Sequence, residues 1–268
     1  RESDVDPVAD VKGVGQNLQD HYSTVLTHAR REPGPFLKLT RADRLTARIA
    51  QAYLFGTGPA TDVPSGFMAF VKSDPALAAP DIQFLFRSAP PAAGPWFPGI
   101  KKAWADGFAC RPILLQPESR GQIRLRSSDP LAPARIHQNF LSTDKDLHTL
   151  RAGFRLLRDV ANQAPMDPFR AREVAPGPDV KTDAEIDAYI RATPATAHHP
   201  AGTCKMGVDE DAVVDGELKV RGIEGLRIAD ASVMPRIARG NINAAVIMIA
   251  EKAADLIRGR AAPPPEHP

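Results

Sequence analysis

Proline is the residue that most constrains the fold of this chain. The sequence has 26 prolines in 268 residues, and between Tyr22 and Asn139 they separate short apolar stretches. These stretches follow one another too closely for helical crossovers between parallel strands, which favours an antiparallel sheet. In the last of them, Ile123 and Leu125 alternate with polar residues, as in a half-buried strand. The predicted strands are residues 65–72, 81–87, 111–116 and 121–126.

Helical patterns occupy other parts of the chain. A helix is expected over residues 41–55, and another over 144–163, where apolar residues recur at helical spacing behind Thr143. Thr182 and Glu185 have the spacing of a capping box, which predicts a helix over 182–191, and Pro194 ends it. The sequence therefore predicts helices that pack on the antiparallel sheet.

The C-terminal segment has a different pattern. The stretch GLRIAD at residues 225–230 predicts a strand, and residues 243–258 predict a helix that is closed by Gly259. A strand that leads to a helix is typical of an α/β layer, so these elements are expected in a separate layer. The fold class is therefore α+β with an added C-terminal α/β part. Three methionines are predicted to lie in the core: Met206, Met234 and Met248.

Charge and composition exclude several classes of function. The chain has 34 basic and 32 acidic residues, so there is no basic surface predicted for a nucleic acid. No apolar run reaches the roughly 20 residues that span a bilayer. Cys110 and Cys204 are far apart and form no CxxC motif, so no metal site is predicted and a cytoplasmic location is expected.

The stretch GVGQNLQDH at residues 13–21 predicts a tight loop. Its two glycines and its amide side chains indicate hydrogen bonds from side chains to the backbone. It is not interpreted as a phosphate-binding loop, because the sixth position of the glycine motif is Leu18 and no apolar strand precedes it.

Four blocks of sequence carry a family resemblance. They are AHHPAGTCKMG at 197–207, AVVD at 212–215, EGLRIADASVMP at 224–235 and GNINAAVIMIAEKAADLI at 240–257. With GVGQNLQDH and RGQIRLRSSDP (120–130), they resemble the C-terminal portion of the glucose-methanol-choline (GMC) oxidoreductases, closest to bacterial alcohol and choline dehydrogenase-like members. The resemblance implies FAD-dependent oxidation of an alcohol to an aldehyde or ketone, by proton abstraction and hydride transfer to flavin N5.

The resemblance also implies a division of the chain. Residues 1–21 would be a linker and an edge loop of the FAD domain, and 22–195 the substrate-binding domain, an antiparallel sheet with helices. Residues 196–260 would be the C-terminal part of the α/β FAD-binding domain, with active-site residues, and 261–268 a disordered tail.

His199 matches the family's catalytic base, and a neutral imidazole near pH 7 is suited to accept an alcohol proton. Asn241 matches the second polar residue that faces the substrate oxygen. Alternatively, His199 caps or fills a turn, and Asn241 or Asn243 is only the N-cap of the last helix. Adjacent side chains on an extended segment point in opposite directions, so His198 is expected to pack or to form a pocket wall. A zinc site is disfavoured because no further ligands have a suitable spacing.

Cofactor residues follow from the same resemblance. Asp230 and Ala231 would lie beside the ribityl and phosphate part of FAD, although Asp230 could also be only a turn residue. Asn241, Ile242 and Asn243 would face the flavin ring, the last two through backbone groups at the helix N-terminus. Cys204 is expected to be a packed small residue.

The family's N-terminal FAD-binding half, with its GxGxxG turn, has no counterpart in this sequence. A complementary half is therefore expected, from the same gene or as a separate chain, and this chain alone is expected not to retain FAD. The alternative is a non-catalytic relic or binding module that lacks FAD. The stretch PSGFMAFV at 64–71 has no acid for a quaternary ammonium group, which favours a neutral alcohol over choline.

Overall fold

The chain folds into two compact units in a computed structural model that describes residues 5–61 and 66–261. The first unit combines the N-terminal residues up to Tyr22 with residues 115–146 and residues from Thr196 onward. The second unit contains residues 23–114 and 147–195. This division differs from the predicted one, which placed the whole span 22–195 in one domain. The predicted tail, except residue 261, lies outside the described residues.

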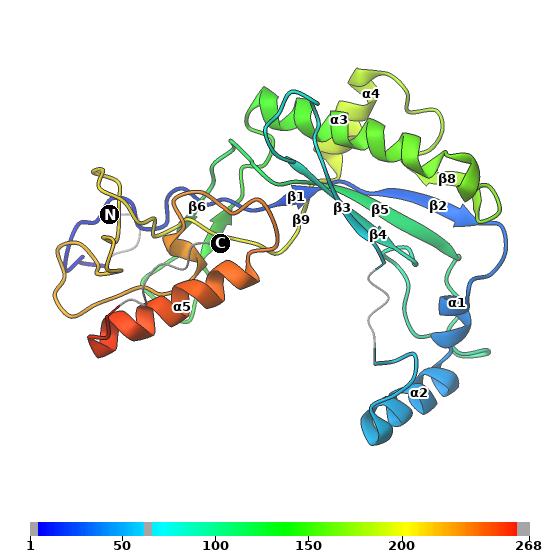
Figure 1. Cartoon of the computed structure of the whole chain (residues 1–268), viewed down its shortest axis with the longest axis horizontal. Coiled ribbons are helices and arrows are strands. Elements are labelled where there is room, and N and C mark those ends of the chain that lie inside the picture. Colours follow the sequence, from blue (N-terminus) through cyan, green and yellow to red (C-terminus); the bar gives the residue numbers. More distant parts are fainter. Residues whose placement is uncertain (1–4, 62–65, 262–268) are drawn as a thin grey trace. The chain divides into compact units, whose positions relative to one another are not determined.

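An antiparallel sheet forms the framework of the second unit (Figure 1). Its long strand β5 pairs with β4 on one side and with β2 on the other, β4 also pairs with β3, and β2 with β8. Every one of these pairings is antiparallel, which confirms the sheet expected from the strands predicted at 65–72, 81–87 and 111–116. The strand predicted at 121–126 is not part of this sheet, because residues 122–124 pair with residues 135–137 in the first unit. The strands are β2 (Leu26–Arg30), β3 (Met68–Val71), β4 (Ile82–Arg87), β5 (Gly107–Leu114) and β8 (Arg170–Ala175).

Two helices cover one face of this sheet, as Figure 1 shows. Helix α3 (Asp144–Ala161) turns Leu150, Phe154 and Leu157 inward, and all three side chains are fully buried. This spacing of four and three residues is the buried stripe that the sequence predicted. Helix α4 (Asp183–Ala192) begins with the predicted capping box of Thr182 and Glu185.

The remaining elements of the second unit are short or exposed. Helix α1 (Pro35–Leu39) precedes helix α2 (Ala42–Phe55), and neither helix has a buried residue. Helix α2 confirms the helix that was predicted over 41–55. A 3₁₀ turn, η1 (Ala164–Met166), follows α3. The short strands β1 (Tyr22–Ser23) and β9 (Ala195–Thr196) lie where the chain passes from one unit to the other.

The first unit consists mainly of turns and extended segments around a small apolar core. Its regular elements are the paired strands β6 (Gln122–Arg124) and β7 (Arg135–His137), the 3₁₀ turn η2 (Ala231–Val233) and helix α5 (Asn243–Arg258). Helix α5 has the predicted bounds, and Gly259 closes it in the left-handed conformation. The core includes Val213, Val214, Leu218, Val233, Ile237, Ile242, Ile249 and Ala253.

Two predictions for this unit are wrong. Residues 225–230 form no strand. In the described chain only Arg227 of this segment forms a bridge, with Lys219, and the segment begins in a turn at Gly225. A strand needs a ladder of partners, which this segment does not have here. Met234 is buried, but Met248 lies on the outer side of α5 and is 60% exposed, so it is not a core residue.

Within the described residues, no helix is long and apolar enough to cross a membrane.

Candidate active site

The segment 13–21 supplies the backbone of the candidate site. The N–H of Gly15 donates to the carbonyl of Thr203 at 2.8 Å, Leu18 pairs with Gly121, and Gln19 pairs with Ala201. Gly15 has a φ of +78°, and a Cβ there would lie 2.3 Å from the carbonyl oxygen of Ile123. The glycine is therefore required by the close approach of two backbones.

The amide side chains of this segment bind the backbone of other loops, as the sequence predicted. The side-chain amide of Asn17 donates to the carbonyl of Gly202 at 3.1 Å. The side-chain amide of Gln19 donates to the carbonyl of Pro235 at 3.1 Å, and its oxygen accepts from the N–H of Ile237 at 3.3 Å. The loop at 235–237 is thereby fixed beside the segment that ends in His21.

The chain after His199 runs beside the segment that begins with Asp230 and Ala231. Three backbone N–H groups, those of Gly202, Cys204 and Met206, donate to the carbonyls of Ala231, Ser232 and Val233 at 3.2, 2.8 and 2.8 Å. The structure thus brings two of the sequence blocks into register, although about 30 residues separate them along the chain. Cys204 lies half-buried in this pairing and is a packed residue.

His199 contacts a buried histidine and a buried aspartate. Its Nδ1 lies 3.0 Å from Nδ1 of His21, and the two rings are nearly perpendicular, at 87°. Its backbone N–H donates to Oδ1 of Asp20 at 2.9 Å, and the hydroxyl of Thr196 donates to the other oxygen of that carboxylate. The far nitrogen of His21, Nε2, lies 3.1 Å from the carbonyl oxygen of Leu115.

Burial sets the protonation of both rings. His21 is 0% exposed, and burial, together with the neighbouring His199, lowers its pKa to about 4. Burial also lowers the pKa of His199, which the Asp20 carboxylate opposes and His198 reinforces. The pKa of Asp20 is raised by burial, against the hydrogen bonds from Thr196 and His199. Both imidazoles are therefore neutral near pH 7.

His198 differs from His199 in its exposure and in its contacts. It is exposed, it has a φ of +65°, and its backbone N–H donates to Thr196 Oγ1 at 2.8 Å. An exposed ring fills no core position, so of the two predicted roles only the pocket wall is compatible with this position.

The residues predicted for the cofactor surround the start of α5 and of η2. Asp230 is exposed, and its Oδ1 accepts from the N–H of Ser232 at 2.7 Å, so it caps η2. Ala231 is half-buried, and Asn241 and Asn243 are exposed. Ile242 occupies the N-cap position of α5 without a side-chain hydrogen bond. The asparagines are therefore not the N-cap, and the first amides of α5 have no acceptor within the helix.

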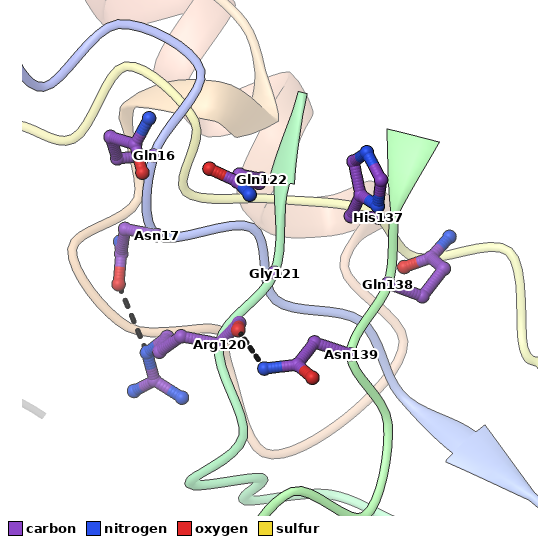
Figure 2. Close-up of a pocket in the computed structure, with 8 residues that line it drawn as sticks. All are labelled: Gln16, Asn17, Arg120, Gly121, Gln122, His137, Gln138 and Asn139. Carbon is purple, nitrogen blue, oxygen red and sulfur yellow. Dashed lines mark hydrogen bonds between the residues drawn. The ribbon is translucent and has the colours of Figure 1, made fainter. Parts of the chain in front are cut away.

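The predicted site residues do not line the polar cavity that Figure 2 shows. This cavity of about 570 Å³ belongs to the first unit, and Arg120 on its wall donates from Nε to Asn17 at 2.9 Å. Its lining is rich in amides and consists of Gln16, Asn17, Arg120, Gly121, Gln122, His137, Gln138 and Asn139. No group of three or more potential metal ligands occurs in the described part of the chain.

Sequence reasoning missed Asp20 and His21, which contact His199. Both belong to the GVGQNLQDH stretch, which predicts a loop and contributes to the family resemblance but assigns no role to either residue. The available signal was the placement of three polar residues, Gln19, Asp20 and His21, directly after an apolar Leu18. Their burial shows that these side chains serve a defined polar network.

Comparisons with known proteins identify the family. A family model described as GMC oxidoreductase, for the C-terminal portion, matches residues 117–250, so the chain belongs to the GMC oxidoreductases. The chain is 42% identical over 265 residues to an oxygen-dependent choline dehydrogenase from Klebsiella pneumoniae, and 42% identical over 260 residues to one from Pseudomonas aeruginosa. Each match covers 97% of this chain and 46% of the relative. The chain thus spans about half the length of these relatives.

Solved structures agree with this assignment. Pyridoxine 4-oxidase from Mesorbium loti matches 97% of this chain and 47% of its own, with a TM-score of 0.78 and 28% identity. A formate oxidase variant from Aspergillus oryzae RIB40, studied for its FAD modification, matches 95% of this chain and 49% of its own, with a TM-score of 0.81 and 25% identity. The fold is that of the C-terminal portion of FAD-dependent GMC enzymes, a family of oxidoreductases that act on alcohol-type donors.

Proposed function

We propose that this chain provides the proton-accepting part of an enzyme that oxidises an alcohol to an aldehyde or ketone with FAD. The observation that carries the proposal is the environment of His199. Its neutral imidazole is half-buried, one ring nitrogen faces His21, and the Asp20 carboxylate lies beside its backbone. Such a ring can accept a proton near pH 7 and can be stabilised once it is charged.

The residues present fit FAD. The first amides of α5 are donors without an acceptor in the helix, and they suit the carbonyl oxygens of a flavin pyrimidine. The exposed Asp230 carboxylate uses Oδ1 for the N–H of Ser232, and its Oδ2 suits a ribityl hydroxyl. Ile242 and Asn243 would hold the ring through backbone groups, while Asp230 and Ala231 would lie along the ribityl chain.

The chemistry assigned to this chain is proton transfer. The O–H bond of the alcohol breaks and its proton moves to His199, which leaves the electron pair on the oxygen. Asn241 would hydrogen-bond that oxygen without competing for the proton. The Asp20 carboxylate stabilises the imidazolium form of His199. Bound FAD supplies the acceptor, at N5, for the hydride that leaves the alcohol carbon as the C=O bond forms.

The rest of the enzyme is part of the same proposal. A complementary half would bind the adenosine and pyrophosphate of FAD, and residues 22–195 would form the substrate-binding domain. The relatives named above are choline dehydrogenases, but the stretch at 66–71, the described part of PSGFMAFV, contains no acid, which supports a neutral alcohol. A cytoplasmic location, predicted from the isolated cysteines, belongs to the same proposal.

Replacement of the base tests the function. In the intact flavin-loaded protein, His199→Ala should lower the rate of flavin reduction by an alcohol roughly 10²- to 10⁴-fold, the range for loss of a general base. His198→Ala is the matched control and should lower the rate of flavin reduction much less. Asn241→Ala should lower this rate by an amount between those of the two histidine variants.

Stopped-flow reduction measures these rates, and an α-deuterated alcohol shows whether hydride transfer is being observed. An unchanged rate in His199→Ala, with an isotope effect present, would refute the role of His199. Intact protein that carries FAD and is reduced by neither choline nor a neutral primary alcohol would instead favour the non-catalytic relic.

A further inference from the structure

We infer that His21 is a positioning residue that fixes the tautomer of His199, so that Nε2 of His199 is the nitrogen that accepts the proton. This inference deepens the proposed function of His199 and rests on it. It requires two hydrogen bonds in sequence, from His199 to His21 and from His21 to the backbone of Leu115.

The first step concerns the proton on His21. Its Nε2 lies 3.1 Å from the carbonyl oxygen of Leu115. A carbonyl oxygen only accepts hydrogen bonds, so Nε2 of His21 must carry the proton. His21 is fully buried, and burial together with His199 lowers its pKa to about 4, against the backbone carbonyls of Ala238 and Leu115, which raise it. The ring therefore carries only one proton near pH 7, and the hydrogen bond to Leu115 places that proton on Nε2. Nδ1 of His21 therefore carries no proton and can only accept a hydrogen bond.

The second step transfers this constraint to His199. The two Nδ1 atoms are 3.0 Å apart, which is a hydrogen-bond distance. One of them must donate, and His21 Nδ1 has no proton to give. Nδ1 of His199 therefore carries the proton, and the lone pair of a neutral His199 lies on Nε2.

The hydrogen bond between His199 and His21 also keeps the accepted proton on His199. When Nε2 of His199 accepts a proton, the Nδ1–H bond to His21 becomes charge-assisted and stronger. His21 does not take that proton over, because burial holds its pKa near 4. The other titratable groups that face His199 are Asp20, which favours the charged ring, and His198, which opposes it.

A second buried histidine provides the matched control. His28, in the second unit, is 1% exposed, and burial with Arg170 and Arg158 lowers its pKa to about 4 as well. It stacks on Phe108, and its Nδ1 has no hydrogen-bond partner. Substitution of His28 removes a buried imidazole but leaves the hydrogen bond between His21 and His199 unchanged.

The test compares substitutions of these two histidines in the intact flavin-loaded protein. His21→Leu should lower the rate of flavin reduction about 3- to 10-fold, as expected for one lost hydrogen bond. It should also move the acid limb of the pH profile to lower pH, because the imidazolium of His199 loses an acceptor. His21→Asn, whose Oδ1 can take the place of Nδ1, should restore most of the rate. His28→Leu should leave the pH profile unchanged.

A spectroscopic measurement on the unmodified protein keeps the inference testable even if the variants do not fold. The ¹⁵N spectrum of histidine-labelled protein distinguishes protonated from unprotonated ring nitrogens. The signals that disappear in His199→Gln belong to His199, one of the seven histidines of this chain. A protonated Nε2 on neutral His199 would overturn the inference.

The outcomes separate this inference from the proposed function. If His199→Ala is inactive while His21→Leu behaves as His28→Leu does, the positioning role is wrong and the base survives. If flavin reduction in His199→Ala proceeds at the normal rate, the proposed function of His199 is refuted, and the positioning role of His21 is refuted with it.

Discussion

Replacement of Asp146 by alanine should destabilise the protein more than any other single loss of an acidic side chain in α3. Asp146 lies in the first turn of this helix and is 1% exposed. Its carboxylate accepts from the hydroxyl of Tyr22 and from the backbone N–H groups of Glu118 and Ser119, each at 2.8 Å. The hydroxyl of Ser119 also donates to it, at 2.6 Å.

The magnitude follows from these four donors. A hydrogen bond to a charged group contributes about 1.5–3 kcal/mol, but the four contributions are not additive because they share one acceptor. Alanine would leave the buried Tyr22 hydroxyl and two backbone N–H groups without their acceptor. Disruption of a buried network of this kind costs about 3–5 kcal/mol, and we expect Asp146→Ala to fall in that range.

Urea unfolding of the intact protein, followed by circular dichroism, measures the change in the free energy of unfolding. Asp144→Ala is the control, because Asp144 is an exposed residue of the same helical turn. This substitution should lower the free energy of unfolding by less than about 1 kcal/mol. Equal losses of stability in the two variants would refute the conclusion that the buried carboxylate holds the 118–119 turn in place.

Two further predictions concern the site. Asp20→Asn removes a carboxylate that raises the pKa of His199, so the acid limb of flavin reduction should move to lower pH, because neutral His199 is the active form. A pH profile that stays in place or moves upward would contradict this. The isolated 268-residue chain should bind FAD weakly or not at all, and the complementary half should restore binding. Stoichiometric FAD on the isolated chain after gel filtration would show that this half carries the affinity.

Local sequence signals predicted the four longer helices and four of the strands. The apolar spacing in 144–163 predicted α3, the Thr182 and Glu185 pair predicted α4, and Gly259 marked the end of α5. These signals succeed because helix ends and buried stripes depend on side chains only a few residues apart. The strand predicted at 225–230 failed because pairing depends on a partner distant in the sequence, which a local pattern does not contain.

The sequence by itself determined the family and singled out His199, since both follow from residues that are contiguous in four short blocks. Only the tertiary structure decided what surrounds that histidine. His21 and Asp20 are about 180 residues away along the chain, and they meet His199 because residues 15–21 run between the backbones of 121–123 and 201–203. The protonation state and tautomer of a histidine depend on burial and on partners within hydrogen-bond distance, and the fold alone supplies both.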